Sequence, residues 1–350
     1  MLERLIAALL AALPSSFFSL LYGFRPLMID GQKLDAKARL LCDLDRKSAA
    51  PVTFESLAEN REKLEKVSSM LAGKPPRLPS IQDITIRGGS DDLPARLYRP
   101  LDEPSLPVLV YYHGGGYIRG SLDSHDGLCA RLAKYGGFAV LSVGYRLAPE
   151  ARFPAAVEDA FAALLWVTEK GVDYGLDSSR MAVGGDSSGG CLAAVVAQQA
   201  ALPGGPLPLF QMLFYPTLDA HLSAPSHDIF ADGFFLTRAR MEGYRDMYLN
   251  NAAERDDIRA SPILNTDLAG LPPALIVTAG FDPLRDEAEE YGKALQAAGV
   301  RVGVVRFPAM VHGFMSMTGV LPEAEKALHQ AADALAHVFA VAAQDNNTAD

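Results

Sequence analysis

The chain is poor in cysteine, with three among its 350 residues. They are Cys42, Cys129 and Cys191, which lie far apart and are odd in number, and no C-x-x-C pair occurs. This pattern argues against a disulfide-stapled secreted fold and indicates neither a zinc site nor a redox site. We expect the three thiols to act as small buried apolar side chains.

Basic residues are scarce relative to acidic ones. The 32 lysines and arginines stand against 42 aspartates and glutamates, a formal net charge of -10. Such a chain offers little to the phosphates of a nucleic acid, so no nucleic-acid partner is expected.

A long hydrophobic run is also missing. The apolar run Leu5 to Leu13 is ended by Pro14, well short of a membrane span. It has the length of a signal-peptide core, yet Glu3 offsets Arg4 and no small-x-small cleavage site follows clearly. We expect an apolar helix packed on the body of a cytoplasmic protein, with export or membrane contact of this segment as the alternative.

The composition that is present, 49% hydrophobic residues, is enough for a large core. The chain changes character at the proline-rich stretch 74–80. Before it the sequence is charged and helix-prone, and after it short β-like runs alternate with helical ones. We therefore place a boundary near Leu78, between a helical segment over 1–78 and a larger α/β domain over 79–350.

The α/β domain begins with two β-like runs around a GGSDD turn, Ile81–Arg87 and Leu93–Tyr98, which predict an antiparallel hairpin. Six short apolar runs follow, at 107–112, 138–143, 181–183, 210–214, 274–277 and 302–305. Helical patterns lie between most of them and after the last, at 127–134, 155–170, 191–201, 284–298 and 323–342. Strands that are apolar on both faces and alternate with helices predict a parallel sheet covered by helices on both sides.

One connection is longer than the others. The stretch 217–256 carries a helical pattern of its own, Thr237–Leu249. Long insertions at the strand-end face of such a sheet tend to be lids. We expect a cap formed by the insertion at about 217–256, to which the N-terminal segment 1–78 contributes.

The strongest chemical signal is the sequence Gly185-Asp186-Ser187-Ser188-Gly189-Gly190, between a predicted strand and a predicted helix. A nucleophile elbow needs this context, because its tight turn tolerates only small neighbours and exposes the serine hydroxyl at the sheet edge. A phosphate-binding loop does not fit, since no Gly-Lys-Ser/Thr follows. We therefore predict that Ser187 is a nucleophile.

A glycine run, His113-Gly114-Gly115-Gly116-Tyr117, follows the predicted strand 107–112. Three glycines in succession let main-chain N–H groups approach a ligand oxygen on which negative charge develops. We predict an oxyanion hole formed by the N–H groups of Gly114, Gly115 and Ser188.

A serine nucleophile needs a base and an acid that orients the base. In the order serine, acid, histidine that this fold requires, His312 is the histidine that lies outside helical patterns and the glycine loop. Asp282 follows the predicted strand 274–277, and it is also placed to cap the next helix. We predict Asp282 as the acid, ahead of Asp286 and Glu287.

At this point the sequence resembles the hormone-sensitive-lipase-like branch of the α/β-hydrolases, which includes many bacterial family IV esterases. The resemblance covers about 81–340 and rests on six blocks in the same order. These are 113–117, 145–156 with its Tyr-Arg-Leu-Ala-Pro-Glu start, 185–190, 231–235, 282–287 and 312–314. It implies an α/β-hydrolase fold with an eight-stranded sheet, a helical cap and hydrolysis of short- to medium-chain acyl esters by Ser187, Asp282 and His312.

Two positions depart from the family pattern. Gly144 stands where the family usually has Asp, and Ser188 stands where it often has Ala. Neither change removes a catalytic group, because the donor at Ser188 is a main-chain N–H, but Gly144 leaves open how the arginine of the next block is hydrogen-bonded. His113 is expected to shape the glycine loop and to take no part in catalysis.

The sequence therefore predicts a serine carboxylesterase that works through an acyl-enzyme and needs neither a metal nor another cofactor. Its expected partner is a small acyl ester, and a homodimer is common in this branch. An amide deacylase with the same triad is the alternative. A ligand-binding protein without turnover is disfavoured, because the gibberellin receptors of this branch lack a working histidine and His312 is present.

Overall fold

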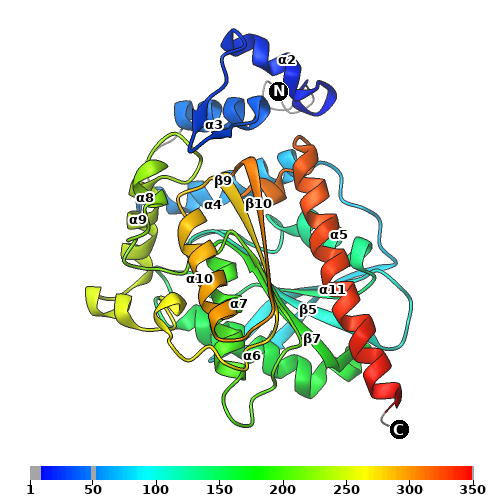
Figure 1. The fold of residues 1–350 in the computed structure, drawn as a ribbon. Helices are drawn as coiled ribbons and strands as arrows, with labels where there is room; N and C mark the ends of the chain where they lie inside the picture. Colours follow the sequence, from blue (N-terminus) through cyan, green and yellow to red (C-terminus); the bar gives the residue numbers. More distant parts are fainter. Residues whose placement is uncertain (1–8, 49–52, 349–350) are drawn as a thin grey trace.

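A sheet of eight strands organises the chain in the computed structural model, which describes residues 9–48 and 53–348 (Figure 1). Across the sheet the strands run in the order β10-β9-β8-β7-β5-β6-β4-β3. Strand β4 is antiparallel to both of its neighbours, and the other neighbouring pairs are parallel. The strands are β3 (Ser80–Arg87), β4 (Asp92–Arg99), β5 (Leu106–Tyr112), β6 (Ala139–Val143), β7 (Leu176–Asp186), β8 (Gln211–Phe214), β9 (Ala274–Phe281) and β10 (Val302–Val311).

Helices cover both faces of this sheet because successive side chains of its strands point to opposite sides. In β5, Val108 and Val110 belong to the core shared with α6 (Ala155–Lys170), α7 (Ser188–Ala200) and α10 (Arg285–Ala297). Leu109 and Tyr111 belong to the core shared with α5 (Asp126–Gly136) and α11 (Pro322–Thr348). The predicted sheet with helices on both sides is confirmed, as is the hairpin of β3 and β4.

Several strands extend beyond the apolar runs that predicted them. Strand β7 reaches Asp186, although the apolar run ends at Val183. Glycines at the end of this strand do not mark a turn; a Cβ at Gly185 would lie 2.3 Å from the carbonyl oxygen of Gly189. The glycine is needed because only a residue without a side chain fits this close to α7. The strand can therefore continue through it to Asp186.

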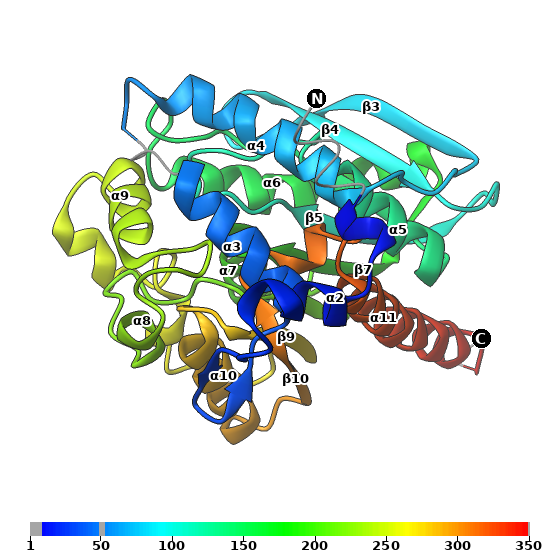
Figure 2. The ribbon, with the colours of Figure 1, turned by 90° about the horizontal axis from the view of Figure 1, so that it is seen from above.

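The N-terminal part of the chain is helical, and its helices α2 (Ser15–Ser19) and α3 (Ala36–Ser48) lie over the ends of the strands: they are at the top in Figure 1 and in front of the sheet in the view from above (Figure 2). It also contains α4 (Leu57–Ala72) and a small hairpin of β1 (Met28–Ile29) and β2 (Gln32–Lys33). Short 3-10 helices occur at Leu20–Tyr22, Gly171–Tyr174, Ala252–Asp256, Pro262–Leu264 and Phe314–Ser316. Arg61 on α4 ties this part to the body, donating to the carbonyl oxygens of Ile118 and Ala148 at 2.8 and 3.0 Å.

The predicted apolar helix is only partly visible. Residues 1–8 lie outside the described residues, whereas residues 9–12 are helical and Leu10 is buried. Among the residues that the structure describes, no helix is both long and apolar enough to cross a bilayer.

The arginine that follows Gly144 is hydrogen-bonded from another part of the chain. Arg146 donates from its backbone N, Nε and Nη2 to Asp159 on α6, at 3.0, 2.8 and 2.8 Å. Asp159 is fully buried and also accepts from the N–H of Gly89 in the β3–β4 turn, at 3.0 Å. This carboxylate therefore joins three segments, and the arginine needs no aspartate at position 144.

Replacing Asp159 with Ala is expected to lower the free energy of unfolding by about 3 kcal/mol, because Arg146 loses its buried partner. Urea denaturation followed by circular dichroism measures this change. The neighbouring Glu158 is 3.7 Å from Arg146, with a side chain 53% exposed, so Glu158→Ala should change stability by less than about 0.5 kcal/mol. Equal effects of the two substitutions would contradict the assigned role of Asp159.

Candidate active site

Three residues from distant parts of the sequence meet at the carboxyl edge of the sheet. Ser187 follows the last residue of β7, Asp282 follows β9 and His312 follows β10. Because parallel strands end at the same edge, residues that directly follow them gather there. The site is therefore a consequence of the strand order.

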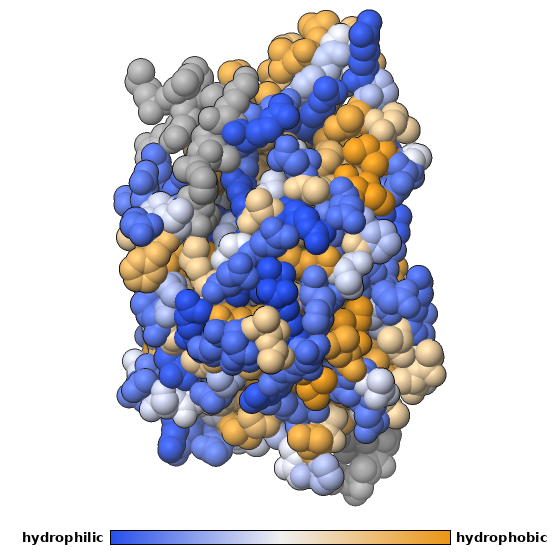
Figure 3. All heavy atoms as spheres, turned by 90° about the vertical axis from the view of Figure 1, so that its left-hand side faces the viewer, coloured by the Kyte–Doolittle hydropathy of each residue, from blue (hydrophilic) through white to orange (hydrophobic). Residues whose placement is uncertain are grey.

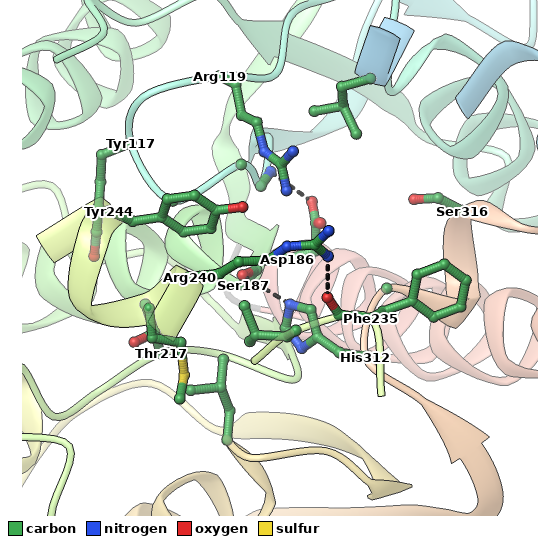
Figure 4. A pocket seen from close by; sticks show the side chains of 18 of the residues that line it. Tyr117, Arg119, Asp186, Ser187, Thr217, Phe235, Arg240, Tyr244, His312 and Ser316 are labelled. Carbon is green, nitrogen blue, oxygen red and sulfur yellow. Dashed lines mark hydrogen bonds between the residues drawn. The ribbon is translucent and has the colours of Figure 1, made fainter. Parts of the chain in front are cut away.

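These three side chains form a chain of hydrogen bonds (Figure 4). Nε2 of His312 lies 3.0 Å from Oγ of Ser187, and its Nδ1 lies 2.8 Å from Oδ2 of Asp282. Asp282 is fully buried, and the side chain of His312 is 12% exposed. A carboxylate at Nδ1 fixes the imidazole with the proton on that nitrogen, so that Nε2 can accept the proton of Ser187.

The backbone at Ser187 has the shape of a nucleophile elbow. Its φ of 54° and ψ of -120° lie in a region that residues other than glycine rarely adopt. The N–H of Ser187 donates to the carbonyl oxygen of Phe214 at 2.9 Å, and its carbonyl oxygen accepts from the N–H of Thr217 at 3.1 Å. A Cβ at Gly189 would lie 1.9 Å from the carbonyl oxygen of Tyr112, so the small residues of the motif are a steric requirement.

Asp282 has a structural role as well as its contact with His312. Its Oδ1 accepts the N–H of Leu284 at 2.9 Å, while its Oδ2 contacts His312. The turn thus leads into α10, which begins at Arg285, one residue after the start of the predicted helical pattern 284–298.

The two alternative acids point elsewhere. Asp286 accepts a hydrogen bond from its neighbour Arg285 at 2.7 Å. Glu287 is 2.8 Å from Nε2 of the fully buried His227 and accepts the N–H of Leu218 at 2.6 Å. Burial raises the pKa of the Glu287 carboxyl group. Neither carboxylate contacts His312.

The glycine loop differs from expectation at its first residue. The N–H of Gly114 donates to Oδ1 of Asp186 at 2.9 Å, so this donor is already engaged and is not free for an oxyanion. The N–H groups of Gly115 and Ser188 have no acceptor in the described part of the chain. The N–H of Gly116 donates to Oγ of Ser188 at 3.0 Å. The free donors are therefore those of Gly115 and Ser188.

Asp186 anchors this loop from beneath. Besides the N–H of Gly114, it accepts the hydroxyl of Tyr111 at 2.8 Å and lies 3.2 Å from Nε2 of His125. Burial by itself would raise the pKa of Asp186, but the charge of His125 and the hydrogen bonds from His125, Tyr111 and Gly114 outweigh it and hold the pKa below its usual value. A charged carboxylate therefore lies next to the nucleophile and fixes the loop.

His113 supports the same loop. Its ring stacks on Tyr145 with centroids 4.4 Å apart, and its Nδ1 is 3.0 Å from the carbonyl oxygen of Gly114. Burial lowers the pKa of His113 to about 4, so the ring is neutral at pH 7. A neutral imidazole that donates to a loop carbonyl oxygen holds the backbone and does not reach Ser187.

A cavity of about 260 Å³ opens above Ser187 and His312. One wall comes from α4, through residues such as Leu64 and Val67, and the opposite wall comes from α9 (Arg238–Tyr248), through Met241 and Tyr244. Short helix α8 (Ser226–Ile229) precedes α9 on the side that Figure 3 shows, where the surface is mostly hydrophilic with small apolar groups. In the described part of the chain, no group of three or more His, Cys, Asp or Glu side chains could hold a metal ion.

Comparison with known proteins places this site in a family. A family model described as the alpha/beta hydrolase fold matches residues 109–316. The chain is 40% identical over 313 residues to the carboxylic ester hydrolase LipN of Mycobacterium tuberculosis. The aligned region covers 87% of this chain and 83% of that protein. The chain belongs to the hormone-sensitive-lipase-like esterases of the α/β-hydrolase superfamily.

Further relatives agree with this assignment. The ethyl acetate hydrolase of Pseudomonas putida is 41% identical over 283 residues, covering 79% of this chain and 89% of that protein. The hyperthermophilic esterase of Pyrobaculum calidifontis superposes with a TM-score of 0.80 at 40% identity, covering 85% of this chain and 97% of that one. This esterase is accordingly a carboxylic ester hydrolase.

Sequence reasoning missed the network below the glycine loop of this esterase. Asp186 lies inside the Gly-x-Ser-x-Gly motif, and an acid at the end of a buried strand must find partners, which is a signal that was present. His125 and Tyr111 carried no such signal, because one lies in a loop and the other in an apolar run. Their contribution follows from the tertiary contacts alone.

Replacing Asp282 with Asn is expected to lower kcat for ester hydrolysis by about four orders of magnitude, because Nδ1 of His312 loses the carboxylate that fixes its tautomer. Steady-state kinetics with p-nitrophenyl butyrate measure this change. Asp286→Asn, four residues further on, should leave kcat within about twofold of the wild type. The opposite ranking of the two variants would make Asp286 the acid.

Replacing Asp186 with Ala is expected to lower kcat by about 10²-fold, since the glycine loop loses its anchor and the oxyanion donors lose their alignment. The matched control is Asp177→Ala near the other end of β7, where the carboxylate binds Ser179 and Arg180 away from the cavity. Wild-type kcat in a folded Asp186→Ala enzyme would show that the loop holds its shape without this carboxylate.

Proposed function

We propose that this esterase hydrolyses short- to medium-chain acyl esters, with Ser187 as nucleophile, His312 as general base and acid, and Asp282 as the residue that orients His312. The hydrogen-bond chain from Oγ of Ser187 through His312 to Oδ2 of Asp282 carries this proposal.

The reaction proceeds in two steps. Oγ of Ser187 attacks the ester carbonyl carbon while Nε2 of His312 takes the hydroxyl proton, and the tetrahedral intermediate collapses as His312 protonates the departing alcohol. A water molecule, deprotonated by the same nitrogen, then attacks the acyl-enzyme, and the acid leaves as His312 returns the proton to Oγ of Ser187. Asp282 stabilises the imidazolium that forms in each step.

The negative charge that develops on the carbonyl oxygen needs main-chain donors. We assign this role to the N–H groups of Gly115 and Ser188, and we withdraw Gly114, whose N–H donates to Asp186. The left-handed backbone at Gly115, with a φ of 134°, supports this assignment, because a Cβ there would lie 2.0 Å from the carbonyl oxygen of Arg119. Only glycine can present this N–H at the site.

The size of the cavity favours short acyl chains. Its volume of about 260 Å³ lies just below the range of small-molecule sites, roughly 300 to 1,000 Å³. The name of the ethyl acetate hydrolase relative points the same way. We also infer that α4 and the insertion with α9 act together as the cap, supported by their forming opposite walls of the cavity over Ser187 and His312.

The decisive experiment compares esters of increasing acyl length. The wild-type protein should hydrolyse p-nitrophenyl acetate and butyrate with a kcat/KM at least about tenfold above that for palmitate, because the walls of the cavity exclude a long chain. Matched p-nitroanilides should react far more slowly, which separates an esterase from an amide deacylase.

Ser187→Ala should abolish hydrolysis of every ester in the series, because no other hydroxyl contacts Nε2 of His312 among the described residues. Ser179→Ala, at an exposed position on β7, serves as the matched control and should keep wild-type activity. Equal rates for the wild type and Ser187→Ala would overturn the mechanism. A homodimer and a cytoplasmic location stay predictions.

A further inference from the structure

Two guanidinium groups point into the cavity beside the proposed nucleophile. Figure 4 shows Arg119, from the glycine loop, and Arg240, from α9, directed toward the centre of the cavity above Ser187 and His312. A purely apolar acyl group would gain nothing from them, and burying a guanidinium without enough partners is costly. Their place in this cavity therefore indicates a ligand that carries hydrogen-bond acceptors for the two guanidinium groups.

Neither guanidinium uses all of its donors within the protein. Nε of Arg119 is buried and has no hydrogen-bond partner in the described part of the chain. The group also lies over the ring of Tyr244, with Cζ 5.1 Å from the ring centroid. A guanidinium has five N–H donors in a rigid fork, and the unpaired edge of Arg119 is fixed in place by the aromatic ring.

Arg240 is paired through one nitrogen. Its Nη1 donates to Oδ2 of Asp45 at 2.8 Å and to the carbonyl oxygen of Phe235. Its Nε and Nη2 make no hydrogen bond with the residues that the structure describes. Asp45 supplies one negative charge against the two positive charges of Arg119 and Arg240, so the pair keeps a net positive charge.

The other two carboxylates that line the cavity, Asp186 and Asp219, accept hydrogen bonds from other groups of the protein. Asp186 accepts from Tyr111 and Gly114. Asp219 accepts the N–H groups of His221 and Ser223 at 2.8 and 3.0 Å and the hydroxyl of Ser223 at 2.6 Å. Two guanidinium groups with unpaired N–H donors that face one cavity are suited to bind an anion, although the whole chain carries a net charge of -10.

We propose that this cavity selects esters that carry a carboxylate on their acyl or alcohol part, and that Arg119 and Arg240 bind this carboxylate. The proposal rests on the proposed function and defines its substrate class as half-esters of dicarboxylic acids or esters of hydroxy acids. The carboxylate would use the free N–H donors of both guanidinium groups, while the ester carbonyl lies against Ser187 and the N–H groups of Gly115 and Ser188.

The first test compares matched substrates by the acid that they release. The anionic substrates are the monoethyl esters of malonic, succinic, glutaric and adipic acid. Each is compared with two neutral analogues: an ethyl ester of equal chain length without the carboxylate, and the same half-ester with its carboxylate replaced by an amide. For at least one length, kcat/KM of the wild type should be about tenfold higher for the anionic ester, mainly through KM. 3-Acetoxypropanoate and its amide test the alcohol side in the same way. This preference should weaken as salt is added.

The second test changes the arginines. Arg119→Gln and Arg240→Gln should each lower the ratio of anionic to neutral kcat/KM by about tenfold, and Arg119→Lys should retain part of it because the charge remains. The matched control is Arg238→Gln on the same helix, which pairs with Asp228 and Glu242 and does not line the cavity. It should leave the ratio unchanged.

A binding measurement separates this inference from the proposed mechanism. Calorimetry with the Ser187→Ala protein should detect tighter binding of monoethyl glutarate than of its neutral monoamide, whether or not the wild type turns either over. Faster hydrolysis of the neutral member in every pair, or an unchanged ratio in both Arg→Gln variants, would overturn the anion site. A wild type that hydrolyses none of the esters but binds the anionic one would overturn the esterase mechanism and leave the anion site standing.

Discussion

The turn between β7 and α7 is the constraint on which the rest of the site depends. Ser187 occupies a backbone conformation that costs of the order of 1–3 kcal/mol, and it persists because the surroundings over-determine it. Hydrogen bonds to Phe214 and Thr217 hold the turn from one side, and the contact of Gly189 with Tyr112 closes it on the other. This geometry lifts the hydroxyl of Ser187 from the sheet edge and presents the first N–H of α7 beside it, so that the proposed nucleophile and one proposed oxyanion donor come from one strained turn.

The buried carboxylates of this protein each accept hydrogen bonds from at least two partners, and these bonds offset the cost of removing the charge from water. Asp282 holds the start of α10 with one oxygen and His312 with the other. Asp186 fixes the glycine loop while it accepts from Tyr111 and His125. Asp159 joins Arg146 to the β3–β4 turn. A buried charge is tolerated only when several donors surround it, so each of these acids necessarily links segments that are distant in sequence.

Helix α4, in the N-terminal part of the chain, forms one wall of the cavity over Ser187 and His312. The cavity walls come from α4, the glycine loop and α9, three segments with no sequence relation to one another. Arg61 clamps α4 to the carbonyl oxygens that follow the glycine loop, and Tyr117 stacks on Tyr248 at the end of α9. The position of either helix is therefore coupled to the glycine loop, to which we assign one of the proposed oxyanion donors.

The sequence was enough to predict the sheet with helices on both faces and the contacts of His312 with Ser187 and Asp282, because these depend on local periodicity and on the order of residues along strands that end at one edge. The predicted strands β7 and β9 ended too early, because the glycines near their ends are required by close packing and do not mark a turn. Three features became visible only in the folded chain: the N–H of Gly114 donates to Asp186, Asp159 pairs with Arg146 in place of an acid at position 144, and Arg119 and Arg240 face one cavity. A hydrogen bond or a charge pair between distant segments leaves no periodic trace in the sequence, whereas the burial of a strand does.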